Sequence, residues 1–420
     1  MRADRLPSAG PPEPSPPAPA GAAAPARRAL RRALVALCIT EITSWGVLYY
    51  ALPVMLARLT RSTGWSTATV MAAFSVGLLV AAGAGVPVGR LLDRHGPRPV
   101  MTAGSLVGVA ALLAIAAAPS LPWFFAAWVL AGLAESALLY PPAFSALTRW
   151  YGPDRVRALT TLSLVAGLAS TVFAPVTAAL VVRLDWRPAY VVLAVLLGAV
   201  TLPLHALCLG PAWPADERRR APGAGTDHVR TVVRSRAFRC LVVAMALAAF
   251  GMYAANLNLV PMLDSRGAGN TLAAAALGLS GAGQVTGRLG YGTLARRTAA
   301  RTRTLAVLVA GSATVALLAL APGGVVALVA AAVVAGCVRG MFTLVGATAV
   351  SDRWGMGRFG TLNGIFSAPT TAALAVAPAG GALLASWLGS YGAAFIVLAT
   401  LVLAGGVAAV GTAVPQHSAA

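Results

Sequence analysis

The chain has 420 residues, of which 58% are hydrophobic and 10% are charged, and its mean hydropathy is +0.78. A soluble domain is typically about a quarter charged, so these few charged groups cannot cover a globular surface, and lipid is expected to cover it instead. The net charge of +20 comes from arginines in short clusters between apolar stretches. This pattern is typical of membrane-protein loops and argues against a nucleic-acid-binding protein.

Residues 1–32 are rich in Pro and Ala and are predicted to form a disordered cytoplasmic tail, which lacks the apolar region of a signal peptide. Apolar stretches of about 20 residues follow, each long enough to cross a bilayer as a helix. No segment shows the alternating polarity of a membrane β-strand. We predict an all-α polytopic membrane protein with twelve transmembrane helices, near residues 33–57, 67–91, 99–118, 122–147, 158–182, 188–209, 238–263, 271–294, 303–321, 324–349, 361–386 and 389–412.

A polar stretch divides these helices into six and six. It predicts an N-terminal bundle over residues 33–209, a cytoplasmic linker over 210–237, a C-terminal bundle over 238–412 and a short cytoplasmic tail over 413–420. With the N-terminus placed in the cytoplasm, the cytoplasmic segments contain 26 arginines and the external loops contain five. The positive-inside rule therefore predicts a multi-pass protein of the cytoplasmic membrane with both termini inside the cell.

The two halves also share a weak repeat. The pair Arg149-Trp150 recurs 204 residues later as Arg353-Trp354, and Pro175 recurs as Pro378 at an offset of 203. Matches of Arg, Trp and Pro carry weight in a chain so rich in Ala and Leu. The repeat predicts two pseudo-symmetric bundles in parallel orientation.

The loop after the second predicted helix reads GRLLDRHGPR from Gly89 to Arg98. It resembles the signature loop G-x-x-x-D-R-x-G-x-R of the major facilitator superfamily. The resemblance implies twelve helices with a substrate site between the halves near the midplane. It also implies a conformational latch in which Asp93 meets the positive end of a helix from the other half. The latch residues expected from the motif are Gly89, Asp93, Arg94, Gly96 and Arg98.

The matching loop of the second half departs from the motif. Arg296 stands where the aspartate would be, so a second latch is expected to be absent or only electrostatic. The segments WGVLYY from Trp45, GWS from Gly64 and AFSVG from Ala73 are similar to the oxalate/formate-antiporter and monocarboxylate-carrier branch. The fifth helix reads APVTA from Ala174, which does not match the drug/proton antiporter motif G-P-x-x-G and weakens an interpretation as a multidrug exporter.

Glu41, Glu135 and Arg339 stand out as charged residues inside predicted helices. Because a charge at membrane depth costs at least about 2.5 kcal/mol, such residues usually face a cavity or a partner. Glu135 and Arg339 are repeat-related, 204 residues apart, and are expected to face each other across the cavity. They would either bind substrate, with Glu135 also carrying protons, or form a structural ion pair. Glu41 is a proton-carrier candidate or a carboxylate that bonds a neighbouring helix.

Three neutral residues on expected cavity helices complete the candidate substrate site, namely Tyr49, Tyr253 and Asn256. We expect no enzyme activity, no cofactor and no metal ion, because no catalytic constellation or phosphate-binding loop is present. The expected partners are a small-molecule substrate, the lipid bilayer and protons, with no nucleic acid, and the protein is expected to be a monomer. The predicted function is secondary active transport of a small solute across the cytoplasmic membrane by alternating access, with a small organic anion coupled to protons as the favoured substrate. The alternatives are efflux of an amphipathic metabolite or drug, and a non-transporting membrane receptor or scaffold with a carrier fold.

Overall fold

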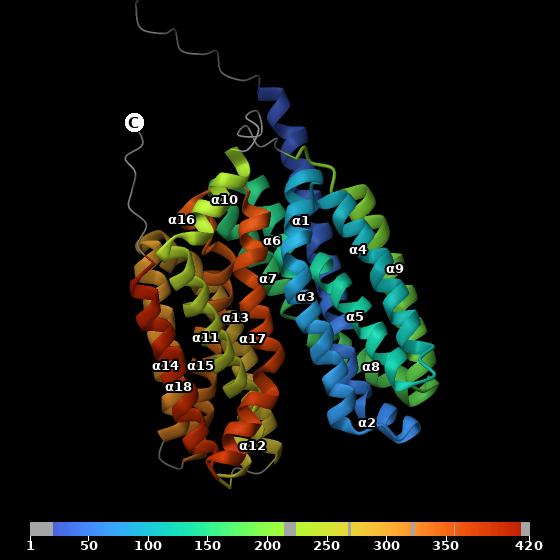
Figure 1. The fold of residues 1–420 in the computed structure, drawn as a ribbon, viewed down its shortest axis with the longest axis vertical. Coiled ribbons are helices and arrows are strands. Elements are labelled where there is room, and N and C mark those ends of the chain that lie inside the picture. Colours follow the sequence, from blue (N-terminus) through green and yellow to red (C-terminus); the bar gives the residue numbers. More distant parts are fainter. Residues whose placement is uncertain (1–19, 214–223, 268–269, 321–323, 357, 413–420) are drawn as a thin grey trace, which may run out of the picture.

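The computed structural model describes residues 20–213, 224–267, 270–320, 324–356 and 358–412, and these residues form helices without any strand. The helices gather into two bundles that lie side by side (Figure 1). The N-terminal bundle contains α1 (Ala20–Ser44), η1 (Trp45–Tyr50), α2 (Ala51–Thr63), α3 (Thr67–His95), α4 (Pro97–Ala116), α5 (Leu121–Leu138), α6 (Tyr140–Tyr151), η2 (Gly152–Asp154), α7 (Arg155–Ala166), α8 (Ala169–Leu184) and α9 (Trp186–Cys208). The C-terminal bundle contains α11 (Arg236–Leu257), α12 (Leu259–Asp264), α13 (Asn270–Arg297), α14 (Ala300–Leu320), α15 (Val325–Thr348), α16 (Ser351–Trp354), α17 (Phe359–Trp387) and α18 (Tyr391–Val410).

These helices match the twelve predicted spans. Ten helical segments of the described residues are long and apolar enough to cross a membrane. One of them, Leu121–Leu184, contains two predicted spans, and α13 supplies a further span that is not among the ten. The expectation of an all-α protein with two six-helix bundles is therefore confirmed.

The structure adds helices to two segments for which the sequence predicted none. α1 begins at Ala20, inside the stretch predicted to be a disordered tail, because this Ala-rich run has high intrinsic helix propensity. The linker contains a short helix, α10 (Ala224–Arg234). Residues 1–19 and the predicted tail over 413–420 lie outside the described residues.

Helix boundaries follow local chemistry. Ser66, Ser235 and Ser390 precede α3, α11 and α18, and each side chain accepts a hydrogen bond from a backbone N–H of the first turn. Gly96 ends α3 at φ 79°, a left-handed conformation that favours glycine, and Pro97 starts α4 directly afterwards. The signature loop is thus a tight turn between two helices.

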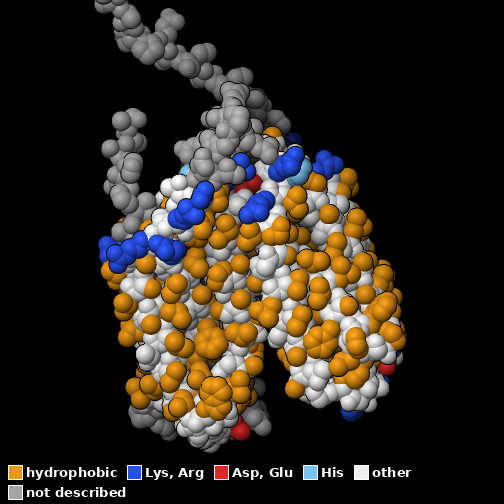
Figure 2. Space-filling model, viewed as in Figure 1, with side chains coloured by type: hydrophobic (Ala, Val, Ile, Leu, Met, Phe, Trp, Pro, Cys, Tyr) orange, Lys and Arg blue, Asp and Glu red, His pale blue; other side chains and the backbone are white. Residues whose placement is uncertain are grey.

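The halves are joined at one end of the molecule and separated at the other (Figure 2). At the joined end, which we call the closed end, the largest cluster of buried apolar residues draws on both halves, including Leu37 and Phe144 from one and Phe238 and Phe359 from the other. The first and last described segments, α1 and α18, also begin and end there (Figure 1). Arginines gather at this end, above a belt of exposed apolar side chains that suits contact with lipid (Figure 2).

Candidate functional site

Three of the transmembrane helices are interrupted near their middle, and a fourth is interrupted close to one end. The first passes through the π-helix η1, the fourth breaks at Leu139, the fifth at Gly167 and Leu168, and the seventh at Asn258. Irregular backbone at membrane depth is tolerated where it is buried in protein or lines a water-filled cavity, and π-helical turns are frequent at functional sites. The interruptions therefore point to the space between the bundles as the functional site.

A cavity of about 670 Å³ occupies this space. Its wall takes Trp45, Tyr49 and Tyr50 from η1 and Tyr140 from the start of α6, and Tyr253 of α11 faces them from the other half. The Trp45 ring lies 5.2 Å from the Tyr49 ring and 5.0 Å from the Tyr140 ring, centroid to centroid. This aromatic wall offers a rigid apolar surface with polar edges to a bound molecule. The predicted site residues Tyr49 and Tyr253 both lie on it.

Arg288, on α13, is the basic residue of the cavity wall. Its guanidinium donates a short hydrogen bond from Nη1 to the carbonyl oxygen of Ser163 on α7, across the boundary between the halves. Its Nε has no hydrogen-bond partner among the described residues. Gly167 leaves room for the guanidinium, since a Cβ at that position would lie 2.4 Å from Nη1. The residue is 4% exposed, so it is a nearly buried cation with a free donor.

The sequence analysis missed Arg288. The residue lies within the predicted span 271–294, but it was counted with the loop arginines that follow. A charge count over the span itself would have found it. α13 continues to Arg297, so residue 288 lies more than two turns inside the helix.

A second cavity, of about 200 Å³, adjoins the first. The two cavities share Trp45, Tyr49, Tyr140, Tyr253, Thr343 and Leu374. Glu135 of α5 lines the smaller one and is 1% exposed, and neither of its carboxylate oxygens has a hydrogen-bond partner among the described residues. Its lining also includes Asn363 and Thr370 of α17, from the other half. The smaller cavity therefore holds a buried, unpaired carboxyl group near the aromatic wall.

Glu41 lies on α1, one turn before Trp45. Its Oε2 accepts a hydrogen bond of 3.1 Å from Trp45 Nε1, and its Oε1 has no partner among the described residues. Glu41 is fully buried and is not part of the wall of either cavity. The bond fixes the indole of Trp45. Because Trp45 follows Glu41 on the same transmembrane helix, this contact is not the predicted bond to a neighbouring helix, and the role of Glu41 as a proton carrier stays a prediction.

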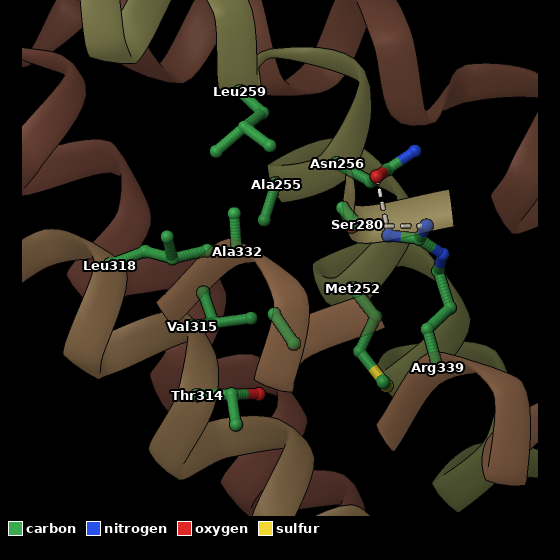
Figure 3. A pocket seen from close by; sticks show the side chains of 11 residues that line it. Met252, Ala255, Asn256, Leu259, Ser280, Thr314, Val315, Leu318, Ala332 and Arg339 are labelled. Carbon is green, nitrogen blue, oxygen red and sulfur yellow. Dashed lines mark hydrogen bonds between the residues drawn. The ribbon is translucent and has the colours of Figure 1, made fainter. Parts of the chain in front are cut away.

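The expected pairing of Glu135 with Arg339 is wrong for this structure. The Arg339 guanidinium donates a short bond to Asn256 Oδ1 and a bond of 3.4 Å to Ser280 Oγ (Figure 3). These residues line a small pocket of about 20 Å³ inside the C-terminal bundle, and neither Arg339 nor Asn256 lines the two central cavities. The Arg339 side chain points into its own bundle, where Asn256 and Ser280 accept its hydrogen bonds. The repeat-related positions of Glu135 and Arg339 therefore do not bring their two charges together.

The signature loop forms a contact between the halves at the closed end. Asp93 Oδ1 accepts a hydrogen bond of 2.9 Å from the backbone N–H of Gly360, and Oδ2 accepts bonds of 2.7 Å from the N–H and from the hydroxyl of Thr361. Both N–H groups belong to the first turn of α17, so the carboxylate sits at the positive end of that helix. Arg149 Nη1 lies 3.7 Å from the same carboxylate. Asp93 thus lies where the resemblance implies.

The rest of the motif divides into two groups. Gly89 allows α3 and α17 to approach closely, since a Cβ there would lie 2.2 Å from the carbonyl oxygen of Gly360. Gly96 leaves room for Trp213, whose indole donates to the carbonyl oxygen of Asp93 at 3.3 Å. Arg94 and Arg98 are exposed and form no ion pair with a described residue.

A second link between the halves uses residues that the sequence analysis did not name. Asp352 of α16 accepts a bond of 2.6 Å from Arg155 Nη2 of α7, in the other half, and a shorter one from Arg303 of α14. Arg296, at the position equivalent to Asp93, is exposed and donates to Thr293 Oγ1. Arg296 therefore forms no second latch, and an ion pair between Asp352 and Arg155 links the halves instead.

We expect Asp93→Asn to slow transport roughly ten-fold or more while leaving the equilibrium affinity for a ligand within about three-fold. The reason is that the variant weakens a charge-assisted contact worth up to about 2 kcal/mol at a helix N-terminus, and neither Asp93 nor its partners Gly360 and Thr361 line a central cavity. Transport rates in proteoliposomes and ligand binding by the purified protein would measure the two effects. Loss of binding in a well-folded variant would contradict a role restricted to switching.

Comparisons with known proteins agree with this architecture. A family model described as Major Facilitator Superfamily matches residues 34–330. The chain is similar to Monocarboxylate transporter 11 of Homo sapiens, with 30% identity over 245 residues, which is 57% of this chain and 49% of that protein. It is also similar to Monocarboxylate transporter 11 of Mus musculus, with 29% identity over 57% of this chain and 52% of that protein. The chain thus spans about half the length of the curated relatives it matches.

Solved structures show the same fold. FucP, crystallised in the outward conformation, superposes with a TM-score of 0.70 at 16% identity, covering 91% of this chain and 98% of that one. A variant of the fucose:proton symporter FucP of E. coli gives the same values. The human organic anion transporter MFSD10 (TETRAN) superposes with a TM-score of 0.69 at 18% identity, covering 92% of this chain and 99% of that one.

Proposed function

Since this chain belongs to the Major Facilitator Superfamily, whose fold and membrane-spanning helices it shares, we propose that it is a secondary active transporter that moves a small organic anion together with a proton. One observation supports this proposal above the others. A buried arginine with a free donor, Arg288, and a buried carboxyl group without a partner, Glu135, line two adjoining cavities between the halves. The similarity to Monocarboxylate transporter 11 supports the same class of substrate.

In the proposed mechanism, the carboxylate of the substrate binds the guanidinium of Arg288, and its organic part packs on the aromatic wall. A guanidinium can offer two parallel N–H donors to a carboxylate. Binding at Arg288 would compete with its bond to Ser163 and so loosen a contact between α13 and α7. Substrate binding would thereby weaken one of the contacts between the two halves.

Glu135 is proposed to carry the proton. An ionised carboxylate without a partner has a large desolvation cost at membrane depth, and uptake of a proton removes that cost. When Glu135 is protonated and an anion is bound at Arg288, the loaded site contains two charges. They are the positive charge of the Arg288 guanidinium and the negative charge of the substrate carboxylate. The halves could then close around a site without net charge, which is the state best suited to crossing the membrane.

The proposed orientation places the closed end in the cytoplasm, because the arginines of the predicted topology concentrate there. The structure would then face outward, with Asp93 at the cytoplasmic side. In a variant without the four native cysteines, Arg94→Cys should react with a membrane-impermeant maleimide only from the cell interior and Arg61→Cys only from outside. The reverse pattern would overturn the orientation.

Flux in proteoliposomes tests the proposed function. Labelled small monocarboxylates should accumulate when the external pH is lower than the internal pH, and accumulation should collapse when an ionophore removes the gradient. Empty liposomes and liposomes with Asp93→Asn serve as controls for leakage and for slowed switching. Absence of carboxylate flux in both directions, with the protein folded, would refute the proposal.

A second candidate function is efflux of an amphipathic metabolite or drug. The smaller cavity favours it, because its wall is mostly apolar and includes Phe144, Phe342 and Phe366. Outward movement of such a compound, with no movement of small monocarboxylates, would favour this candidate. A receptor or scaffold without transport activity predicts a filled centre, and the cavity of about 670 Å³ supports a carrier instead.

A further inference from the structure

A groove of about 420 Å³ lies between α1 and α9, away from the central cavities, with which it shares no residue. Its wall has a basic part and an apolar part. The basic part consists of Arg28, Arg31 and Arg32, and the rest consists of Val35, Ala36, Ile39, Leu204 and Cys208. The groove therefore presents two kinds of surface, one suited to an anion and one suited to a hydrocarbon chain.

The two parts follow each other along one face of α1. Arg28, Arg32, Val35 and Ile39 are spaced by four, three and four residues, which places them in a single stripe of the helix. The stripe spans roughly 16 Å along the axis. Its basic end lies toward the closed end, where α1 begins, and its apolar end lies deeper among the transmembrane helices (Figure 1). Val35 and Ile39 are 52% and 42% exposed, so their side chains face the surroundings of the protein.

No described residue compensates the positive charge of the groove. The three arginines are exposed, and none of them forms an ion pair with a residue in the described ranges. Arg32 Nε donates to Cys208 Sγ at 3.3 Å, a neutral acceptor on α9 that fixes one guanidinium over the groove. Three guanidinium groups on two successive turns attract a phosphate, which accepts paired N–H donors from arginine.

We propose that this groove binds one anionic phospholipid from the leaflet at the closed end. Its phosphate lies on Arg28, Arg31 and Arg32, and one acyl chain lies along Val35, Ile39 and Leu204. Free inorganic phosphate would satisfy the basic part but would leave the apolar part uncovered, which is why the observations favour the lipid. The proposal depends on the membrane location of the chain and not on the identity of the transported substrate.

Native mass spectrometry of the purified full-length protein tests the proposal, with phosphatidylglycerol and phosphatidylcholine added at equal concentration. We expect one retained phosphatidylglycerol and no comparable retention of phosphatidylcholine. An arginine beside an anionic lipid surface strengthens binding about five-fold, so the triple change Arg28→Gln, Arg31→Gln and Arg32→Gln should weaken retention by roughly 100-fold. The matched control changes Arg296, Arg297 and Arg301 to Gln, which removes the same charge at the same end but outside the groove.

A second variant keeps the three arginines. Val35→Glu places a carboxylate one turn from Arg31 and Arg32, where it would pair with them and repel the phosphate, so it should also abolish retention. Equal retention of both lipids by the unmodified protein would overturn the proposal, and so would unchanged retention by the triple variant. Complete displacement of phosphatidylglycerol by millimolar inorganic phosphate would also overturn it, because the site would then be one for a free anion.

Discussion

Replacing Arg288 with Gln is expected to lower monocarboxylate transport by about 100-fold and to weaken equilibrium binding by a similar factor. Loss of a hydrogen bond to a charged partner costs roughly 1.5–3 kcal/mol, and removal of the basic group leaves a buried anion without compensation. Arg288→Lys should restore little activity, since an ammonium lacks the planar pair of donors. Flux in proteoliposomes and binding by the purified protein would measure both effects.

The controls separate binding from switching. Arg288 also bonds Ser163 across the halves, so a change there could act on the contact alone. Asp93→Asn disrupts another contact between the halves and should slow transport without loss of affinity, whereas Arg288→Gln should lose affinity. Arg296→Gln removes an exposed charge from the same helix and should have no effect on either.

Gly167→Ala offers an independent test. The added Cβ would lie 2.4 Å from Arg288 Nη1, so the guanidinium must move, although its charge remains. We expect weaker binding with the basic residue still present. Normal transport of carboxylates by Arg288→Gln would contradict the proposed role, and so would a native substrate that is a cation.

Much of the fold could be predicted because long apolar segments mark most of the membrane-spanning helices. The twelve helices follow from apolar length, and the division into two bundles follows from the central polar stretch and from the repeat. The breaks at η1, Leu139 and Gly167 were not predicted, since a helix interrupted within an apolar stretch leaves hydropathy unchanged. Residues at or beside those breaks line the larger cavity on its N-terminal side. The feature that locates the site is therefore one that hydropathy does not report.

Some of the residues predicted for the site line the cavities and others do not, because sequence patterns locate a residue on a helix but do not give the direction of its side chain. Tyr49, Tyr253 and Glu135 were placed on the right helices and do line the cavities. Arg339 was also placed on the right helix, but its side chain donates hydrogen bonds to Asn256 and Ser280 within its own bundle. Neither hydropathy nor the repeat offset predicts the direction in which a long side chain points. Asp93 was located more securely, because its partners are backbone N–H groups of a helix terminus rather than a particular side chain.

Replacing Glu135 with Gln is expected to separate anion movement from proton movement. The variant keeps the shape of the side chain, cannot ionise, and should therefore behave like the permanently protonated form. Exchange of labelled for unlabelled substrate across the membrane should continue within about three-fold of the original rate. Accumulation driven by a pH gradient should disappear, because the proton is no longer taken up and released during the cycle.

Glu41→Gln is the matched variant for this test, since it removes another buried glutamate carboxylate of the N-terminal bundle. Glu41 lies outside both cavity walls and accepts a bond from Trp45, which an amide oxygen can also accept. We therefore expect Glu41→Gln to keep the response to a pH gradient, with at most a modest loss of rate. The opposite result, in which Glu41→Gln loses the response and Glu135→Gln keeps it, would move the proton site from α5 to α1. Retention of gradient-driven accumulation by both single variants and by the double variant would exclude a proton-carrying role for either residue.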